Sequence, residues 1–264
     1  MDLGVADRRY LIVGGTAGMG WAAAEVLATE GARVALVGRN RDRAAEAAGR
    51  LPGEKAVAVI GDVSRPGGAE AAVADAVAHL GGLDGIAVTT GTGMSAHTSL
   101  EAATDDVWAA AFDDVLMGTV RSVKAALPHL VESGGGTVVT TAAYSIHAYH
   151  PARLPYVVMK SGVAAFTKTV AKEFGPKGVR ANCVCPGAIE TEALSGLRRE
   201  LAGARGVSPE GLLEQVMVEE WHMDVALGRP GQPGEVGDLF AFLLSSRAGY
   251  LTGAVVNIDG GTDF

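Results

Sequence analysis

A glycine-rich turn, set between a short apolar strand and a helix, constrains the fold of this chain more than any other segment. The strand pattern runs from Tyr10 to Val13, and the turn that follows contains Gly14, Gly18 and Gly20 before a helical pattern begins. Glycines allow a tight turn and the close approach of a pyrophosphate, and the N–H groups at a helix N-terminus bind its charge. The order predicts a dinucleotide-binding βα unit, with an ordinary βα turn as the alternative.

Strand-like apolar segments recur along the rest of the chain, and helical patterns separate them. These segments are residues 33–37, 55–60, 85–89, 137–141, 179–184 and 254–258. Repeated β-then-α units predict a parallel sheet that is wound in both directions. We therefore expect an α/β fold, a Rossmann-type doubly wound parallel sheet of about seven strands with helices on both faces.

The length and composition of the chain fit one large α/β domain. The chain has 264 residues, of which 48% are hydrophobic, and this is enough for a sizeable core. Because we find no linker and no internal repeat, we expect a single domain over residues 1–264. Its parts are a nucleotide half at about 1–93, a catalytic and substrate half at about 94–264, and an irregular helical lid at about 192–229.

The charge of the chain excludes several classes of partner. The formal net charge is −8 and the isoelectric point is about 5.3. Such an acidic protein is unsuited to nucleic acid or to an anionic membrane surface. The N-terminus has no apolar signal segment, and no run approaches the ~18 apolar residues of a membrane span. We therefore expect a cytoplasmic protein that acts on a small molecule.

The two cysteines, Cys183 and Cys185, lie on one predicted strand. Alternate strand positions face the same side, so the two thiols can meet, but buried free thiols are the expected state. A metal site needs more ligands than these two. We predict no metal.

The end of the second predicted strand indicates which dinucleotide would bind. An NAD site places an acidic residue there, which binds the 2′-hydroxyl of the ribose. This chain has Gly38 at that position and Arg39 directly after it. A guanidinium matches the geometry and charge of a 2′-phosphate. We therefore expect NADP(H) to be preferred over NAD(H), the alternative being a solvated basic loop that includes Arg41 and Arg43.

Tyr156 and Lys160 form the strongest candidate for acid–base chemistry. Positions four apart lie on the same face of a helix, so a phenol and an ammonium lie side by side. A nearby cation favours the ionised phenol, and we expect Lys160 to lower the pKa of Tyr156. Such a tyrosine exchanges a proton with a carbonyl or alcohol oxygen. By itself the pair is also compatible with an ordinary helix face.

Taken together, these motifs resemble the short-chain dehydrogenase/reductase family over nearly the whole chain. Gly14-x-x-x-Gly18-x-Gly20 resembles its nucleotide motif, and Tyr156-x-x-x-Lys160 resembles its catalytic pair. The resemblance implies a homotetramer and an NADP(H) site. The implied cofactor-binding residues are Gly14, Thr16, Ala17, Gly18, Met19, Gly20, Arg39, Asp62, Val63, Thr90, Gly91, Tyr156, Lys160, Pro186, Gly187, Ile189 and Thr191.

The chain departs from the family pattern at two catalytic positions. The family serine, thirteen residues before the tyrosine, corresponds to Ala143, and the family asparagine aligns with Val115. Loss of one hydrogen-bond donor to the reacting oxygen typically costs ~10²–10³ in rate. We expect Ser145 or Tyr144 to supply the missing donor. A third departure places Val13 where the family has a threonine that ties the glycine-rich turn.

These features predict an NADP(H)-dependent oxidoreductase that interconverts a ketone and a secondary alcohol. Tyr156 is the predicted acid/base, and Lys160 and Ser145 assist it. We expect a largely apolar small substrate in contact with four side chains, namely Tyr144, His147, Trp221 and His222. Two alternatives stay open: a catalytically weakened nucleotide-binding sensor or scaffold, and a non-redox epimerase or dehydratase on the same fold.

Overall fold

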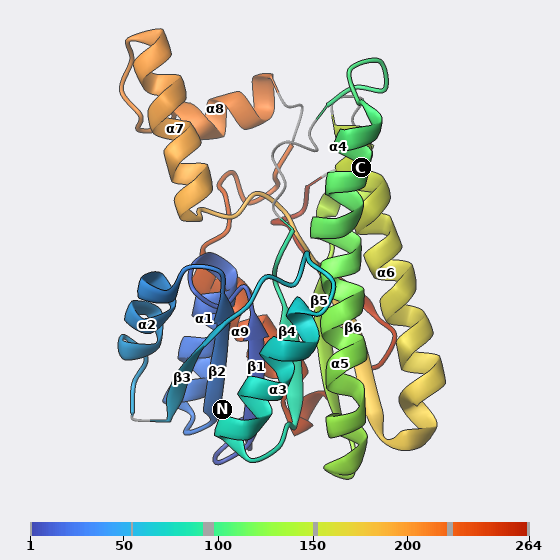
Figure 1. Cartoon of the computed structure of the whole chain (residues 1–264). Helices are drawn as coiled ribbons and strands as arrows, with labels where there is room; N and C mark the ends of the chain where they lie inside the picture. Colours follow the sequence, from blue (N-terminus) through green and yellow to red (C-terminus); the bar gives the residue numbers. More distant parts are fainter. Residues whose placement is uncertain (1, 54, 92–97, 150–152, 221–223, 263–264) are drawn as a thin grey trace.

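The chain folds around a seven-stranded parallel sheet (Figure 1). The computed structural model describes residues 2–53, 55–91, 98–149, 153–220 and 224–262. The strand order is β3-β2-β1-β4-β5-β6-β7, and every neighbouring pair is parallel. The strands are β1 (Arg9–Val13), β2 (Arg33–Gly38), β3 (Ala56–Ile60), β4 (Gly85–Val88), β5 (Gly136–Thr141), β6 (Val179–Pro186) and β7 (Val255–Ile258). This confirms the predicted doubly wound sheet.

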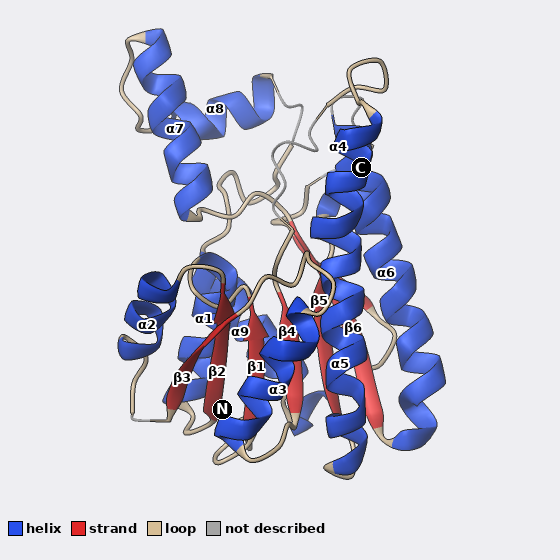
Figure 2. Ribbon diagram, in the orientation of Figure 1, coloured by secondary structure: helices blue, strands red, loops and turns tan. Residues whose placement is uncertain are grey.

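Helices cover both faces of the sheet, and a separate pair of helices lies beyond its carboxyl edge (Figure 2). The helices are α1 (Gly18–Thr29), α2 (Arg41–Gly49), α3 (Gly68–Leu80), α4 (Asp105–Ala111), α5 (Gly118–Glu132), α6 (Leu154–Phe174), α7 (Glu192–Arg205), α8 (Leu212–Glu219) and α9 (Pro233–Leu244). A π-helical turn, Phe112–Met117, joins α4 to α5. The chain is therefore helical from Asp105 to Glu132, with a change of helix type at this turn.

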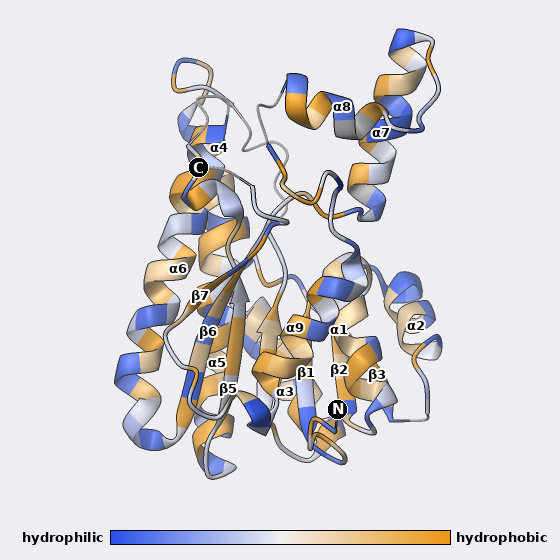
Figure 3. Cartoon of the chain, turned by 180° about the vertical axis from the view of Figure 1, so that it is seen from behind, coloured by the Kyte–Doolittle hydropathy of each residue, from blue (hydrophilic) through white to orange (hydrophobic). Residues whose placement is uncertain are grey.

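Alternate residues of the strands supply two separate hydrophobic cores. Leu11 and Val13 pack against α3, α5 and α6 on one face, whereas Tyr10 and Ile12 pack against α1 and α9 on the other. Because parallel strands are buried on both sides, they are apolar along their whole length. Figure 3 shows this as mostly orange strands between helices with blue outer positions. The sheet is therefore a rigid base for side chains at its ends.

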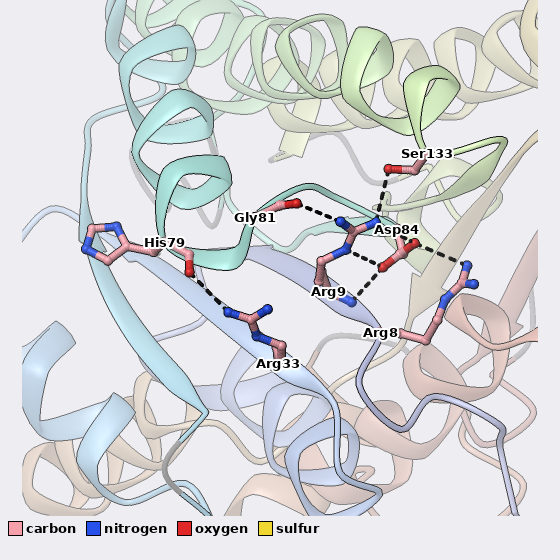
Figure 4. Close-up of polar contacts among 7 residues, drawn as sticks. All are labelled: Arg8, Arg9, Arg33, His79, Gly81, Asp84 and Ser133. Carbon is pink, nitrogen blue, oxygen red and sulfur yellow. Dashed lines mark hydrogen bonds and ion pairs between the residues drawn. The ribbon is translucent and has the colours of Figure 1, made fainter.

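The edge of the sheet where the strands begin is closed by an arginine network around Asp84 (Figure 4). Asp84, directly before β4, is 6% exposed. It accepts hydrogen bonds from the N–H and the guanidinium of Arg9, at 2.9 and 2.8 Å, and lies 3.5 Å from the guanidinium of Arg8. Arg9 also donates to the carbonyl of Gly81 and to the hydroxyl of Ser133. The network ties the ends of α3 and α5 to the sheet.

The lid that the sequence placed at about 192–229 consists of α7 and α8 in the described part. Both helices stand beyond the carboxyl ends of the strands (Figure 1). Ala202 of α7 packs with Leu212 and Val216 of α8, so Leu212 joins the two lid helices. Met217 is also buried, but it packs against Tyr144 at the sheet edge. Among the described helices, none is both long and apolar enough to span a membrane.

Candidate active site

The glycine-rich turn is held by a hydroxyl that the family pattern places elsewhere. Thr89, directly after β4, donates to the carbonyls of Val13 and Gly14 at 3.0 and 3.2 Å. Gly14 has φ +82°, and a Cβ on Gly20 would lie 2.5 Å from the Thr89 hydroxyl oxygen. Gly14 is therefore required by its backbone conformation, and Gly20 is required because there is no room for a side chain. The hydroxyl of Thr89 ties the turn, although Val13 carries none.

A cleft of about 470 Å³ opens at the carboxyl edge of the sheet, beside this turn. Of the predicted cofactor residues, the structure brings twelve together around it. They are Gly14, Thr16, Ala17, Gly18, Met19, Gly20, Arg39, Asp62, Val63, Thr90, Gly91 and Thr191. The cleft lies where the strand order reverses between β1 and β4, and ligands of open parallel sheets bind at such points. N–H groups at the start of α1 would bind an anion there.

The two arginines on one wall of the cleft differ in their partners. Arg43 donates to the Glu192 carboxylate at 2.5 Å, and both side chains are exposed. Arg39 is exposed and forms no ion pair or hydrogen bond with the described residues. The Asn40 side chain caps α2 by accepting from the N–H of Arg43 at 2.9 Å, and this fixes the backbone beside Arg39. Arg39 is therefore the available cation on this wall.

Asp62 lies on the same cleft in a fixed orientation. Its carboxylate accepts from the hydroxyl and the N–H of Ser64, at 2.6 and 3.1 Å. The hydrogen bond from the Ser64 hydroxyl is the largest influence on Asp62, and with the nearby charge of Arg39 it holds the pKa of this carboxyl below its usual value. Asp62 is therefore ionised at neutral pH and acts as a hydrogen-bond acceptor.

Lys160 joins this cleft to α6. Its side chain is 3% exposed and donates to the carbonyls of Thr141 and Thr90, at 2.9 and 3.3 Å. Thr90 itself lines the cleft. Burial lowers the pKa of Lys160 to about 8, against 10.5 for a free lysine. The ammonium is therefore held in place by backbone oxygens and is close to losing its proton at neutral pH.

Tyr156 has a pKa shift opposite to the one that its spacing from Lys160 predicted. The ammonium nitrogen of Lys160 lies 5.7 Å from the centre of the Tyr156 ring. Burial raises the pKa of Tyr156, and the charge of Arg153 only partly opposes this effect. The prediction that this pKa is lowered was wrong. The spacing along the helix reveals the neighbouring cation, but it does not reveal that burial removes water from the phenol and raises its pKa. The phenol is protonated at neutral pH.

The two positions at which the sequence predicted a departure from the family's catalytic pattern are both buried. Val115 lies in the π-helical turn and packs against Ala111 and Met159, and a Cβ on Gly91 would lie 2.9 Å from its Cα. Ala143 directly precedes the 3₁₀ turn Tyr144–Ile146. The Ser145 hydroxyl on that turn is also buried and has no hydrogen-bond partner among the described residues. Such an unpartnered hydroxyl is uncommon in a folded chain.

The remaining predicted residues that the structure describes do not line the cleft. Pro186 ends β6, and Gly187 and the buried Ile189 follow it. Tyr144 is buried, whereas His147 is exposed. Trp221 and His222 lie outside the described residues. Cys183 and Cys185 are buried free thiols, as predicted, and the described residues contain no cluster of side chains suited to a metal ion.

Four further residues at the site were missed or left unassigned by the sequence analysis. Thr89, Asp114 and Glu192 line the cleft or tie its turn, and Arg153 lies beside Tyr144. Arg153 stands three residues before Tyr156, and this spacing was the available signal, because such positions share a helix face. The contact of Glu192 with Arg43 joins residues 149 positions apart, and no local pattern reveals it.

Comparison with known proteins identifies the family. A family model described as enoyl-(acyl carrier protein) reductase matches residues 14–263. Human dehydrogenase/reductase SDR family member 4 is 30% identical over 98% of this chain and 88% of that protein. The chain belongs to the short-chain dehydrogenase/reductase family. This family membership places it among the oxidoreductases.

Two further relatives show how far the similarity extends. The 3-oxoacyl-[acyl-carrier-protein] reductase FabG of Chlamydia muridarum is 28% identical over 97% of this chain and 98% of that protein. The solved structure of L-sorbose reductase from Gluconobacter frateurii, complexed with NADPH and L-sorbose, is 32% identical. It covers 99% of this chain and 98% of that chain, with a TM-score of 0.92. The similarity therefore includes the sheet, the cleft and the catalytic helix.

Proposed function

We propose that this protein is an NADP(H)-dependent reductase that interconverts a ketone and a secondary alcohol. The observation that carries this proposal is the continuity of the site. The cleft beside the glycine-rich turn reaches Thr90, and the carbonyl of Thr90 accepts from Lys160, which shares a helix face with Tyr156. A dinucleotide bound at the turn would therefore extend toward an acid–base pair. The relatives named as L-sorbose, levodione and 3-oxoacyl reductases support the reaction class.

Different residues of the chain would have different roles in the reduction. The nicotinamide supplies the hydride, so the protein must position the substrate and supply a proton. Tyr156 is suited to donate that proton to the carbonyl oxygen, because burial keeps the phenol protonated. The Lys160 ammonium, held by two carbonyls, would contact the nicotinamide ribose and return a proton to Tyr156. Pro186, Gly187, Ile189 and Thr191 would hold the nicotinamide.

Arg39 is the proposed basis of a preference for NADP(H). Its guanidinium is on the cleft wall, beside the end of β2, and forms no ion pair with a described carboxylate. Gly38 carries no side chain, and a Cβ there would lie 2.5 Å from Thr16 Cγ2, so an acidic residue at this position would be crowded. An unpaired guanidinium at this position matches a 2′-phosphate. We propose Arg39 as the residue that binds this phosphate.

Ser145 is the proposed replacement for the hydroxyl that Ala143 lacks. Its oxygen is buried without a described partner, and such a group gains the most from a new hydrogen bond. Ala143 and Val115 equally favour a second candidate function, a nucleotide-binding protein with weakened turnover. We also propose a cytoplasmic location and, from the family resemblance, a homotetramer.

The test is NADPH oxidation by the purified protein with a panel of ketones, comparing wild type with Tyr156→Phe. Loss of a positioned general acid lowers the rate by about 10²–10⁴. Tyr250→Phe makes the same change at a fully exposed position and should leave the rate unchanged. A Tyr156→Phe rate equal to wild type would contradict the proposal. Tight NADPH binding with no ketone reduced would favour the binding-protein alternative.

A further inference from the structure

Arg153 brings a positive charge to the substrate end of the site. It directly precedes the first residue of α6, and its Cα is three positions before that of Tyr156. Residues three apart lie on the same side of a helix. The N–H of the following residue, Leu154, donates to the carbonyl of Thr98 at 3.2 Å, which fixes the start of the helix. The side chain of Arg153 therefore leaves the helix on the side where Tyr156 acts.

The guanidinium of Arg153 is held against Tyr144. Its Nη1 donates to the phenol oxygen of Tyr144, and its central carbon lies 5.7 Å from the centre of that ring. The Tyr144 ring packs against Met217 of the lid and against Ala188, which lies within the proposed nicotinamide segment. Arg153 is thus placed between the lid, the nicotinamide side of the site and Tyr156. The charge of Arg153 acts to lower the pKa of Tyr156, but burial raises this pKa by more.

Arg153 differs from three other partly buried arginines in having no described carboxylate partner, and from Arg33 and Arg180, which donate to backbone carbonyls, in donating to a side chain. Arg9, Arg121 and Arg198 each lie within 2.8 Å of a carboxylate, those of Asp84, Asp113 and Glu190. Arg153 is also partly buried, but no described carboxylate pairs with it. Its one described hydrogen bond is to the phenol oxygen of Tyr144. A cation in a partly dry site favours an anionic ligand, because water no longer screens the attraction.

We propose that Arg153 and Tyr144 form a subsite for a carboxylate, and that the substrate is a keto acid or its hydroxy-acid product. The inference rests on the proposed function, because Tyr156 defines where the carbonyl lies. A guanidinium offers paired N–H donors that match a carboxylate, and the partly buried Leu194 would supply apolar contact for the carbon skeleton. The carboxylate would lie one helical turn from the reacting carbonyl. The apolar substrate predicted from the sequence thereby acquires one charged end.

The test is ligand-observed NMR titration of cyclohexanecarboxylate and cyclohexanecarboxamide, which share a ring and differ in charge. We expect wild type to bind the carboxylate about 10–100-fold more tightly than the amide, the range for a charge-assisted hydrogen bond. Arg153→Gln should abolish this preference, and Arg153→Lys should retain part of it. Arg247→Gln removes the same charge at an exposed position beyond α9, and should keep the full preference.

Equal binding of the acid and the amide by wild type would overturn the proposal, as would an unchanged preference in Arg153→Gln. The titration is made with and without NADPH, and because no substrate is turned over, it reports on binding at the subsite alone.

In kinetics, Arg153→Gln should raise KM for keto acids more than KM for neutral ketones. Equal changes for keto acids and neutral ketones would assign the charge to Tyr156 and not to the substrate. Failure of the reductase proposal would appear separately, as a Tyr156→Phe variant with unchanged rate.

Discussion

The two edges of the sheet are built from the same strands, but they differ in how their buried polar groups are paired. At the edge where the strands begin, Asp84 is nearly enclosed and is bound by Arg9 and Arg8. At the carboxyl edge, Thr90 and Ser145 have buried hydroxyls without a described partner, and Arg39 and Arg153 lack a described carboxylate.

This difference suggests that one edge serves the stability of the fold and the other edge serves ligand binding. Polar groups that are satisfied inside the chain hold elements together, whereas buried groups without partners cost free energy unless a ligand satisfies them. The Asp84 network joins β1, β4, α3 and α5, and nothing in it faces the cleft. At the carboxyl edge, a ligand could satisfy the hydroxyls of Thr90 and Ser145. Changes at one edge should therefore leave the other edge's property intact.

The largest effect on stability is expected for Asp84→Asn. Burial alone would raise the pKa of Asp84, but hydrogen bonds from Arg9 outweigh it and hold the pKa below its usual value. Removing one partner of a buried ion pair lowers the free energy of unfolding by about 3–5 kcal/mol. Chemical denaturation should show this loss, while the affinity for NADPH stays unchanged. Asp238→Asn, at an exposed position of α9, is the matched control.

The pH dependence sharpens this prediction. Because the folded pKa of Asp84 is depressed, its contribution to stability is complete above the unfolded value of about 4. The contribution disappears as the pH falls through the depressed folded value. The difference in unfolding free energy between wild type and Asp84→Asn should therefore shrink only in acid. A difference that is constant from neutral pH to below pH ~3 would argue against the assignment.

A smaller effect, of opposite sign, is expected for Lys160→Met. Burial lowers the pKa of Lys160 to about 8. Between that value and about 10.4 the unfolded chain binds more protons, so the stability of wild type rises with pH in this window. The methionine variant should lack this rise, should be more stable than wild type by on the order of 2–3 kcal/mol at neutral pH, and should lose activity.

The control for this variant is Lys172→Met, an exposed position on the same helix. Denaturation curves at pH 7, 8, 9 and 10 would compare the three proteins. A Lys160→Met variant that is less stable than wild type at neutral pH would show that Lys160 serves the fold and not the site.

The smallest effect is expected at the pair formed by Arg43 and Glu192. Both side chains are exposed, and such pairs contribute ~0–1 kcal/mol. Glu192→Gln should therefore leave the melting temperature within about 2 °C of wild type. Because the pair lines the cleft, freeing Arg43 should tighten NADPH binding several-fold and leave NADH binding unchanged. Equal tightening for both nucleotides would mean that Arg43 does not contact the 2′-phosphate.

The sequence predicted the sheet and the glycine-rich turn because their signals are local. Apolar runs, glycines and the Tyr156–Lys160 spacing depend on neighbours a few residues apart. The contact of Arg9 with Asp84 joins residues 75 positions apart, and the tie from Thr89 to Val13 joins residues 76 apart. Only the folded chain brings these groups together. The sequence showed that Val13 lacks a hydroxyl, but not that Thr89 supplies one.

The predicted direction of the pKa shift of Tyr156 was wrong for a different reason. The sequence showed the neighbouring cation, and a cation lowers the pKa of a phenol. It did not show that the ring is desolvated, and this effect is the larger one. The direction of a pKa shift depends on burial, which is a property of the packed chain. The role of Tyr156 as proton donor survives the correction, because a protonated phenol is what reduction requires.

The most direct test of the proposed site is a titration of the purified protein with NADPH and, separately, with NADH, followed by nucleotide fluorescence. Wild type should bind NADPH about 10–100-fold more tightly than Arg39→Ala does, the range for a charge-assisted contact with phosphate. Both proteins should bind NADH alike. Asp84→Asn, at the opposite edge, should bind both nucleotides as wild type does. Binding of neither nucleotide by wild type would contradict the assignment of the carboxyl edge as a dinucleotide site.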